Sequence, residues 1–367
     1  MKIIAFYLPQ FHPFKENDEW WGKGFTEWTN VGKARKIYPG HYQPRVPADL
    51  GYYDLRLPEV REQQAQMAKD YGISAFCYYH YWFGNDKQLM EKPLEEVIRL
   101  QKPDFPFCLC WANHSWENKN WNPSALKMKS KLLIEQKYPG LEDSEKMFYT
   151  LLSAFKDKRY LKVNNQLVYM IYRADSLPYY KEFCELWNKL AKENGLSGFY
   201  FISNVQSENL LEHPANKYMD ANALCNMNTI FGNRTQNTIL MKISKLIHFP
   251  VRIITYKKAI KYLISDKHKN NKIYPVILPN WDHSPRLGYM GTIYHNSTPE
   301  LFKKLIKKAI GVIKGKPKED QIIFIKSWNE WAEGNYLEPD LKFGKRYLEV
   351  IKEAIQESVI ENPSILE

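Results

Sequence analysis

The sequence predicts an α/β protein of the (β/α)₈ barrel, or TIM barrel, class, and three observations lead to this prediction. The chain has 367 residues, enough for such a barrel, which needs about 250. Short apolar runs alternate with amphipathic helical stretches. Polar and aromatic residues follow the ends of these runs. We expect one domain over residues 1–367, with a basic insertion at about 232–272. A doubly wound open sheet is the alternative.

The expected strands are short runs rich in β-branched and aromatic residues, which favour extended backbone. In chain order they are Lys2–Leu8, Ser74–Tyr79, Phe107–Trp111, Leu167–Tyr172, Phe199–Asn204, Ala221–Asn226, Pro275–Leu278 and Gln321–Lys326. The expected helices are Leu57–Tyr71, Lys92–Gln101, Ser144–Phe155, Pro178–Asn194, Pro299–Lys314 and Phe343–Glu357. The first helix has Pro58 near its start and Gly72 after its end, which are typical helix boundaries.

The composition is that of a soluble globular protein, with 44% hydrophobic and 25% charged residues. No run reaches the ~18 apolar residues of a membrane span. The apolar run before Pro9 is too short for a signal peptide, so we expect a cytoplasmic protein. The five cysteines are an odd number, and three lie in apolar runs, which indicates reduced core residues rather than a disulfide framework.

Much of the formal net charge of +11 lies in one segment, because residues 234–272 contain ten Lys or Arg and a single acid, Asp266. A solvated helical insertion with a positive bias is the simpler explanation. The other is an anionic partner, such as a peripheral membrane surface or a lipid-linked glycan. No RNA- or DNA-binding motif accompanies the segment, so we expect no nucleic-acid partner.

Residues typical of binding and catalytic sites follow the carboxyl ends of the expected strands, which is the face where TIM barrels build their sites. In chain order they include Glu27, His80, Trp111, Asn113, Asn204, Asn228, Trp281, Asn329, Glu330, Trp331 and Glu333. For any single His or Trp a packing role is the alternative. The convergence of so many at strand ends is what predicts a site.

The most informative stretch is Ile322–Asp340, where an apolar strand ends in Glu330 and Glu333. Paired carboxylates commonly cleave glycosidic bonds, and Trp faces commonly stack on sugar rings. Residues three apart share a face only if the chain turns between them, and Gly334 suits such a turn. Two acids at close range also push one pKa upward, as an acid/base pair requires. The alternative is a surface turn with two solvated glutamates.

The sequence contains no phosphate-binding Gly-rich loop, HExxH, paired CxxC, EF-hand or GxSxG motif. We therefore expect no metal and no cofactor. The absence of an early phosphate site also disfavours a Rossmann-type nucleotide-sugar transferase.

Five motifs together resemble the WbsX-type family of polysaccharide biosynthesis, whose members are often named glycosyltransferases. They are FYLPQFHP (Phe6–Pro13), GFTEWTNV (Gly24–Val31), AFCYYHYWF (Ala75–Phe83), CWANHSW (Cys110–Trp116) and SWNEWAEGNYLEPD (Ser327–Asp340). The resemblance spans nearly the whole chain. The family is similar to glycoside hydrolase family 99, the endo-α-mannosidases and endo-α-mannanases. Those are TIM barrels with two catalytic glutamates after the eighth strand.

The resemblance implies a mechanism in which Glu330 is a base toward the substrate's 2-hydroxyl, closing a 1,2-anhydro sugar, and Glu333 is the general acid/base. It also implies site-lining roles for Glu27, Tyr79, His80, Trp111 and Asn113. The implied activity is that of a retaining α-glycoside hydrolase acting on a manno-configured or related oligo- or polysaccharide, such as an O-antigen glycan. A glycosyltransferase or transglycosylase using the same pair is one alternative, and a non-catalytic glycan-binding barrel is another.

Overall fold

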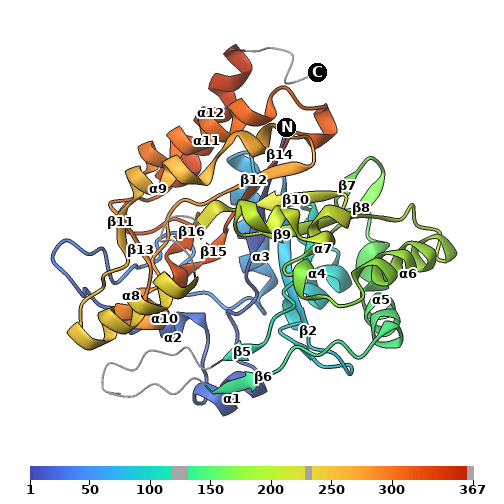
Figure 1. Cartoon of the computed structure of the whole chain (residues 1–367), viewed down its shortest axis with the longest axis horizontal. Coiled ribbons are helices and arrows are strands. Elements are labelled where there is room, and N and C mark those ends of the chain that lie inside the picture. The colour runs from blue at the N-terminus through green and yellow to red at the C-terminus, as the bar shows by residue number, and fades with distance from the viewer. Residues whose placement is uncertain (118–130, 228–233, 362–367) are drawn as a thin grey trace.

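The protein is described by a computed structural model that covers residues 1–117, 131–227 and 234–361, so Asn228 lies outside the described residues. Eight parallel strands close into a barrel with helices around it (Figure 1). Its strands are β1 (Lys2–Tyr7), β2 (Ala75–Trp82), β4 (Phe107–Trp111), β8 (Gln166–Ile171), β9 (Phe199–Val205), β10 (Ala221–Leu224), β12 (Ile273–Ile277) and β14 (Ile322–Ile325). They coincide with the expected strands, and the TIM-barrel prediction is confirmed.

The barrel closes because β1 pairs in parallel with both β2 and β14. Ala5 lies opposite Phe76 on one side and Ile325 on the other. Strands of a parallel barrel are covered on both faces, which is why they appear in the sequence as nearly continuous apolar runs. All four residues of β14 are buried. The open-sheet alternative is therefore wrong.

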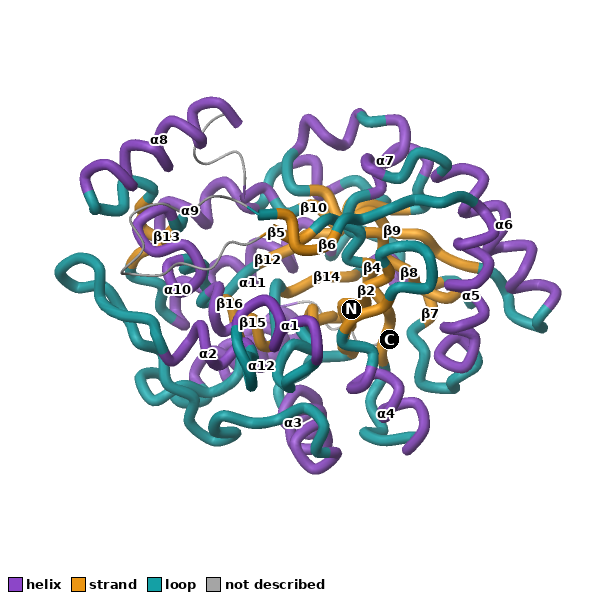
Figure 2. The backbone as a smooth tube through the Cα atoms, turned by 90° about the horizontal axis from the view of Figure 1, so that it is seen from below, coloured by secondary structure: helices purple, strands orange, loops and turns teal. Residues whose placement is uncertain are grey.

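The expected helices surround the barrel (Figure 2). They are α3 (Pro58–Asp70), α4 (Lys92–Leu100), α5 (Leu141–Phe155), α6 (Tyr180–Glu193), α11 (Pro299–Ile313) and α12 (Arg346–Glu361). Shorter elements include α1 (Lys15–Trp21), α2 (Glu27–Gly32), β3 (Gln88–Leu89), β5 (Trp116–Glu117), β6 (Leu132–Ile134), β7 (Lys162–Val163), α7 (Pro214–Tyr218) and α10 (Ser284–Leu287).

The basic segment after β10 forms α8 (Arg234–Ile247), β11 (Ile253–Thr255) and α9 (Tyr256–Leu263). Strand β11 pairs with β13 (Ile293–His295), and α9 contacts α11. Among the described helices, none is long and apolar enough to cross a membrane.

Side chains of the barrel strands alternate between the interior and the helical layer, and β2 shows both directions. Tyr79 stacks on Phe6 in the interior, with ring centroids 5.4 Å apart. His80 instead meets the hydroxyl of Tyr169 at 2.8 Å. Tyr169 packs against Trp187 of α6, so His80 faces the helical layer. All five cysteines are buried and unpaired, as expected.

Candidate active site

The segment after β14 forms a tight hairpin that carries both glutamates. Strand β15 (Asn329–Glu330) pairs with β16 (Asn335–Tyr336), and a 3₁₀ turn, η7 (Trp331–Glu333), joins them. Glu330 is only 5% exposed and Glu333 only 9%. Because both carboxylates are buried at the carboxyl end of the barrel, the alternative of a solvated surface turn is wrong.

Gly334 closes this hairpin, as the sequence predicts. It adopts φ +60°, a conformation that costs other residues free energy because Cβ crowds the backbone. A Cβ atom at this position would also lie 2.7 Å from Cβ of Asp282. The turn therefore needs glycine for its backbone angles and for the close approach of the neighbouring loop.

The two glutamates have opposite pKa displacements. Burial, then the charge of Glu333 and a hydrogen bond with it, raises the pKa of Glu330 well above its usual range. Burial alone would raise the pKa of Glu333 too, but Arg286, His283 and Lys326 outweigh it and hold that pKa below its usual range. At a pH between these two pKa values the pair carries one proton, and the opposite displacements favour Glu330 as the carboxyl that holds it.

Arg286 is the cation that makes the pKa values of Glu330 and Glu333 differ. Its Nη1 donates to Oε1 of Glu333 at 2.6 Å, and its Nη2 donates to Oε1 of Glu27 at 2.7 Å. Glu27 is 1% exposed, begins α2 and also accepts from the backbone N–H of Ala332 at 3.1 Å. Its Oε2 has no hydrogen-bond partner among the described residues. Glu27 and Glu333 thus share one guanidinium, which joins the first and last strand-end loops.

Lys326, the residue after β14, supplies a second cation. Its Nζ lies 5.1 Å from the ring centroid of Trp281 and 3.4 Å from the hydroxyl of Tyr172. Burial would lower its pKa, but the charges of Tyr172 and Glu330 raise it, so Lys326 stays protonated. Glu330 also acts on Tyr79 and Tyr81, because burial and then the charge of Glu330 raise the pKa of both phenols.

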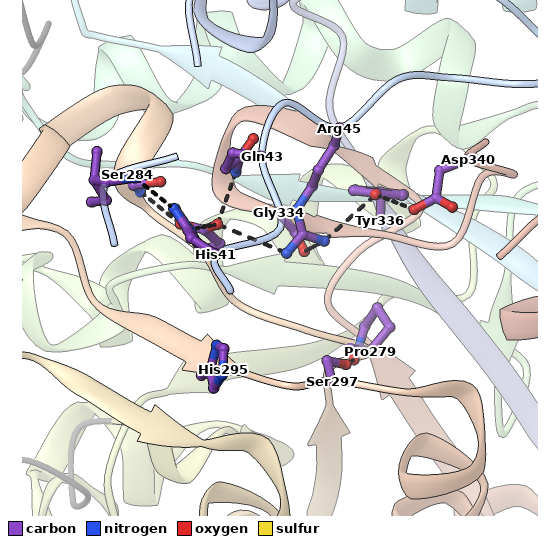
Figure 3. Close-up of polar contacts among 12 residues, drawn as sticks. His41, Gln43, Arg45, Pro279, Ser284, His295, Ser297, Gly334, Tyr336 and Asp340 are labelled. Atoms are coloured by element: carbon purple, nitrogen blue, oxygen red, sulfur yellow. Dashed lines mark hydrogen bonds and ion pairs between the residues drawn. The ribbon is translucent and has the colours of Figure 1, made fainter. Parts of the chain in front are cut away.

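Asp282 orients the loop that carries Arg286. Figure 3 labels three of the residues that bond to it or lie beside it, His41, Gln43 and Ser284. Its Oδ1 accepts from the N–H of Ser284 at the start of α10, and its own N–H donates to the carbonyl of Glu333 at 2.7 Å. Its Oδ2 accepts from His41 and Gln43, both at 2.8 Å. Burial opposes ionisation, but these donors and Arg45 hold its pKa below the usual range.

Glu338 holds the hairpin from the opposite side. It is 2% exposed and accepts from Nε1 of Trp331 at 2.6 Å, from Gln64 at 2.7 Å and from the hydroxyl of Tyr53 at 2.8 Å. Burial raises its pKa to about 7 despite these three donors. Trp331, which separates the two glutamates, stacks on Tyr336 with ring centroids 3.8 Å apart.

The structure brings together some of the candidate residues and not others. Glu27, Tyr79, Trp281, Glu330 and Glu333 belong to one cluster, joined by the contacts of Arg286 and Lys326 and by the charge of Glu330. Asn204 faces the same interior, because its neighbour Ser203 bonds outward to Asn216 of α7.

Three candidates lie outside the cluster. His80 and Trp111 face the helical layer, where Trp111 stacks on Phe183 of α6 with centroids 5.7 Å apart. Burial lowers the pKa of His80 to about 3, so this imidazole is neutral. The amide of Asn113 is occupied by the backbone of Arg173, to which it both donates (2.9 Å) and accepts (2.7 Å).

Two hairpin candidates are used for packing. The amide of Asn329 bonds the N–H of Leu8 at 2.8 Å and its carbonyl at 3.0 Å, which ties the hairpin to β1. Trp331 is 1% exposed and its ring is covered. These residues position the glutamates rather than present a surface to a ligand.

The sequence did not point to Arg286, Lys326 or Tyr172 as site residues. Two signals could have found them. Lys326 and Tyr172 are polar residues at the last position of an apolar strand-like run. Arg286 lies three residues after His283, at a spacing that shares a helix face. Among the described residues, no group of three or more His, Cys, Asp or Glu could hold a metal ion.

Comparison with known proteins identifies the family. The model of the family described as Glycosyltransferase WbsX matches residues 3–351. The chain belongs to the WbsX family. A relative, the uncharacterized protein WxcX of Xanthomonas campestris pv. campestris (strain ATCC 33913), is 33% identical over 357 residues. That alignment covers 96% of this chain and 49% of WxcX, so the chain spans about half the length of its curated relative.

Two solved structures have a similar fold to this WbsX-family chain. One is the GH99 endo-α-mannosidase of Bacteroides thetaiotaomicron in complex with bis-tris propane, with a TM-score of 0.59, 15% identity and coverage of 99% of this chain and 98% of that one. The other is described as a glycoside hydrolase-like protein, with a TM-score of 0.61, 15% identity and coverage of 96% and 93%. At this identity the likeness concerns the fold.

Proposed function

We propose that this WbsX-family protein is a glycan-active enzyme of the retaining α-glycoside hydrolase type, with Glu330 and Glu333 as its acid/base pair. The observation that carries the proposal is two buried carboxylates at the end of the last barrel strand whose pKa values are displaced in opposite directions. Such a pair supplies one proton donor and one proton acceptor at the same pH. The fold shared with an endo-α-mannosidase supports a manno-configured or related substrate.

In the proposed reaction Glu330 accepts the proton of the substrate's 2-hydroxyl, whose oxygen closes onto the anomeric carbon as a 1,2-anhydro sugar. Glu333 protonates the departing glycosidic oxygen. It then removes a proton from the water that attacks the anomeric carbon, while Glu330 returns its proton to the 2-oxygen as the ring opens, so the configuration is retained. At a pH between the two pKa values of the free protein, the proton is favoured on Glu330. The roles therefore require the proton to pass to Glu333, along the hydrogen bond between the two carboxyls, when substrate binds.

The cations of the site have defined tasks in this scheme. Arg286 is bonded to Glu333 and keeps it ionised in the free protein. Lys326 lies beside Tyr172 and Trp281 and places a positive charge next to both glutamates. Each lowers the free energy of the negative charge that the pair retains.

The first test is product analysis on a panel of α-linked oligosaccharides and O-antigen-type glycans. Wild type is expected to cleave one of them with retained anomeric configuration. Glu330→Gln and Glu333→Gln are each expected to reduce kcat by at least about 10³-fold, because each removes one half of an acid/base pair. Glu142→Gln, at an exposed glutamate of α5, is the matched control and keeps activity. Cleavage that survives both active-site substitutions would refute the proposal.

A second test assigns the acid. An aryl glycoside with a good leaving group needs no protonation, so a variant that lacks only the acid regains activity on it. The proposed roles predict that Glu333→Gln recovers on the aryl substrate and Glu330→Gln does not. The opposite result would give the acid role to Glu330, the carboxyl that holds the proton in the free protein.

The second candidate function is a glycosyltransferase or transglycosylase that uses the same pair. The family description and the basic segment at residues 234–272 favour it. It predicts no cleavage of glycans in water, and glycan extension once nucleotide-sugar or lipid-linked donors are added.

A further inference from the structure

Helix α8 turns an apolar face away from the protein. Ile239, Ile243, Leu246 and Ile247 are 40–79% exposed, and Phe249, just past the end of the helix, is 45% exposed. Among the residues of this helix whose burial is described, the buried or half-buried ones are Leu240, Met241 and Ser244. A surface helix normally buries its apolar face and exposes its polar one. Here large aliphatic side chains are exposed on a side next to the packed one.

The exposed apolar residues share one face by helical periodicity. Ile239, Ile243 and Leu246 follow one another at steps of four and three residues, which places them in one row along the axis. Figures 1 and 2 both show α8 at the periphery of the molecule, with one side unaccompanied by other described elements. We call the surface formed by Ile239, Ile243, Leu246, Ile247 and Phe249 the α8 face.

Lysines border the α8 face. Lys242 follows Ile239 by three residues and precedes Leu246 by four, so it adjoins the apolar row, and Lys245 lies one step further round. Both are exposed. The single acid of residues 234–272, Asp266, pairs with Lys269. No acid of this segment therefore offsets the positive charges of Lys242 and Lys245. An apolar row edged by cations matches the acyl boundary and the headgroups of an anionic bilayer.

The α8 face lies beside the active-site loop. Helix α8 contacts η5 (Gly288–Met290), which directly follows α10 and Arg286. The ring of His248 packs edge-on against Tyr289, with centroids 6.0 Å apart. Arg252, just beyond the helix, donates to the carbonyl of Met290 at 3.5 Å. These contacts connect α8 to the loop that carries Arg286, the residue that bonds Glu333.

We propose that the α8 face docks this protein on an anionic membrane surface, with the aliphatic side chains in the headgroup–acyl boundary and Lys242 and Lys245 at the lipid phosphates. The positive charge of residues 234–272 favours an anionic surface over a neutral or cationic one. A nucleic acid binds mainly through its phosphates and would not contact the exposed aliphatic row, so the row favours a membrane over a nucleic acid. Docking through α8 brings the loop of Arg286 close to the membrane.

The test is co-sedimentation of the 367-residue chain with vesicles of phosphatidylglycerol mixed with phosphatidylcholine, and with vesicles of phosphatidylcholine alone. Wild type is expected to bind the anionic vesicles. The double variant Ile243→Gln/Leu246→Gln is expected to lose about tenfold in affinity for each side chain, since each removes a large apolar group from the boundary. The double variant Lys242→Gln/Lys245→Gln is expected to lose about fivefold per lysine on anionic vesicles only.

The matched control is Leu341→Gln/Ile360→Gln, which removes two aliphatic side chains that are 71% and 80% exposed elsewhere on the surface. The control is expected to bind like wild type. Absence of wild-type binding to anionic vesicles would overturn the proposal, as would an equal loss in the control. Light scattering tests whether the α8 face instead joins two copies of the chain. A dimeric wild type together with a monomeric Ile243→Gln/Leu246→Gln variant would show such an interface and overturn membrane docking. The readout needs no enzymatic activity, so its failure is distinct from failure of the proposed function.

Discussion

Glu338 is expected to make the stability of the protein fall as the pH rises. Its pKa is raised from an ordinary value of 4.5 to about 7 because burial disfavours the charged form. The folded state then binds more protons than the unfolded state between these two values, so the free energy of unfolding decreases with pH in this window. The stabilisation is complete below about pH 4.5 and lost above about pH 7.

The magnitude follows from the same two values. At 1.36 kcal/mol per pKa unit, the difference between 4.5 and about 7 corresponds to about 3 kcal/mol in total. Between about pH 5 and about pH 8, Glu338 should account for a loss of about 2.5 kcal/mol. Glu330, whose pKa is also raised by burial, changes stability in the same direction, so the contribution of Glu338 must be measured as a difference between variants.

The assay is urea unfolding of wild type and Glu338→Gln at about pH 5 and about pH 8, with the slope m checked for constancy. The variant is less stable at low pH, because one amide oxygen cannot accept from all three donors around Glu338. Its stability should nevertheless decline less with pH than that of wild type, by about 2.5 kcal/mol. Equal declines within about 0.5 kcal/mol would refute the reasoning. Glu62→Gln, at a carboxylate of α3, controls for removal of a single acid.

Three further outcomes are expected. Gly334→Ala should destabilise the protein by about 2–4 kcal/mol, measured by urea unfolding, because φ is +60° and the new Cβ would meet Asp282 at 2.7 Å. Arg286→Met should lower kcat/KM by about 10²-fold or more and raise the pKa of Glu333, seen as a shift of the acidic limb of the pH–rate profile to higher pH; an unmoved limb would contradict the role given to Arg286. His80→Phe should leave KM within about twofold of wild type, because this side chain faces the helical layer, and a large rise in KM would place it in the site after all.

The positions of the barrel strands could be predicted because a parallel barrel covers both faces of every strand. That burial makes each strand a short apolar run bounded by polar residues, a local pattern that is visible without knowledge of the partners. The Glu330–Glu333 pair was predictable for a similar reason, since its spacing, the adjoining apolar run and Gly334 are all local features.

The direction of single side chains was not predictable in the same way. Tyr79 and His80 are neighbours at the end of one strand. A shift of that strand's register by one residue would turn Tyr79 toward the helical layer and His80 toward the barrel interior. Only the register of β2 places Tyr79 toward Glu330 and His80 toward Tyr169. Trp111 and Asn113 were expected in the site because they follow a strand end and belong to a motif of the resemblance. Trp111 instead packs against α6, and Asn113 bonds the backbone of Arg173.

The sequence by itself determined the barrel, the location of the two glutamates and the charge of the segment after β10, because each depends on residues close together in the chain. The tertiary structure decided which residues act on those glutamates. Glu27 and Arg286 are separated by 259 positions in the sequence, yet their side chains meet at 2.7 Å. The guanidinium of Arg286 also bonds Glu333 and lowers the pKa of Glu333 relative to that of Glu330. Charge interactions depend on distance in space, which barrel closure sets and sequence spacing does not.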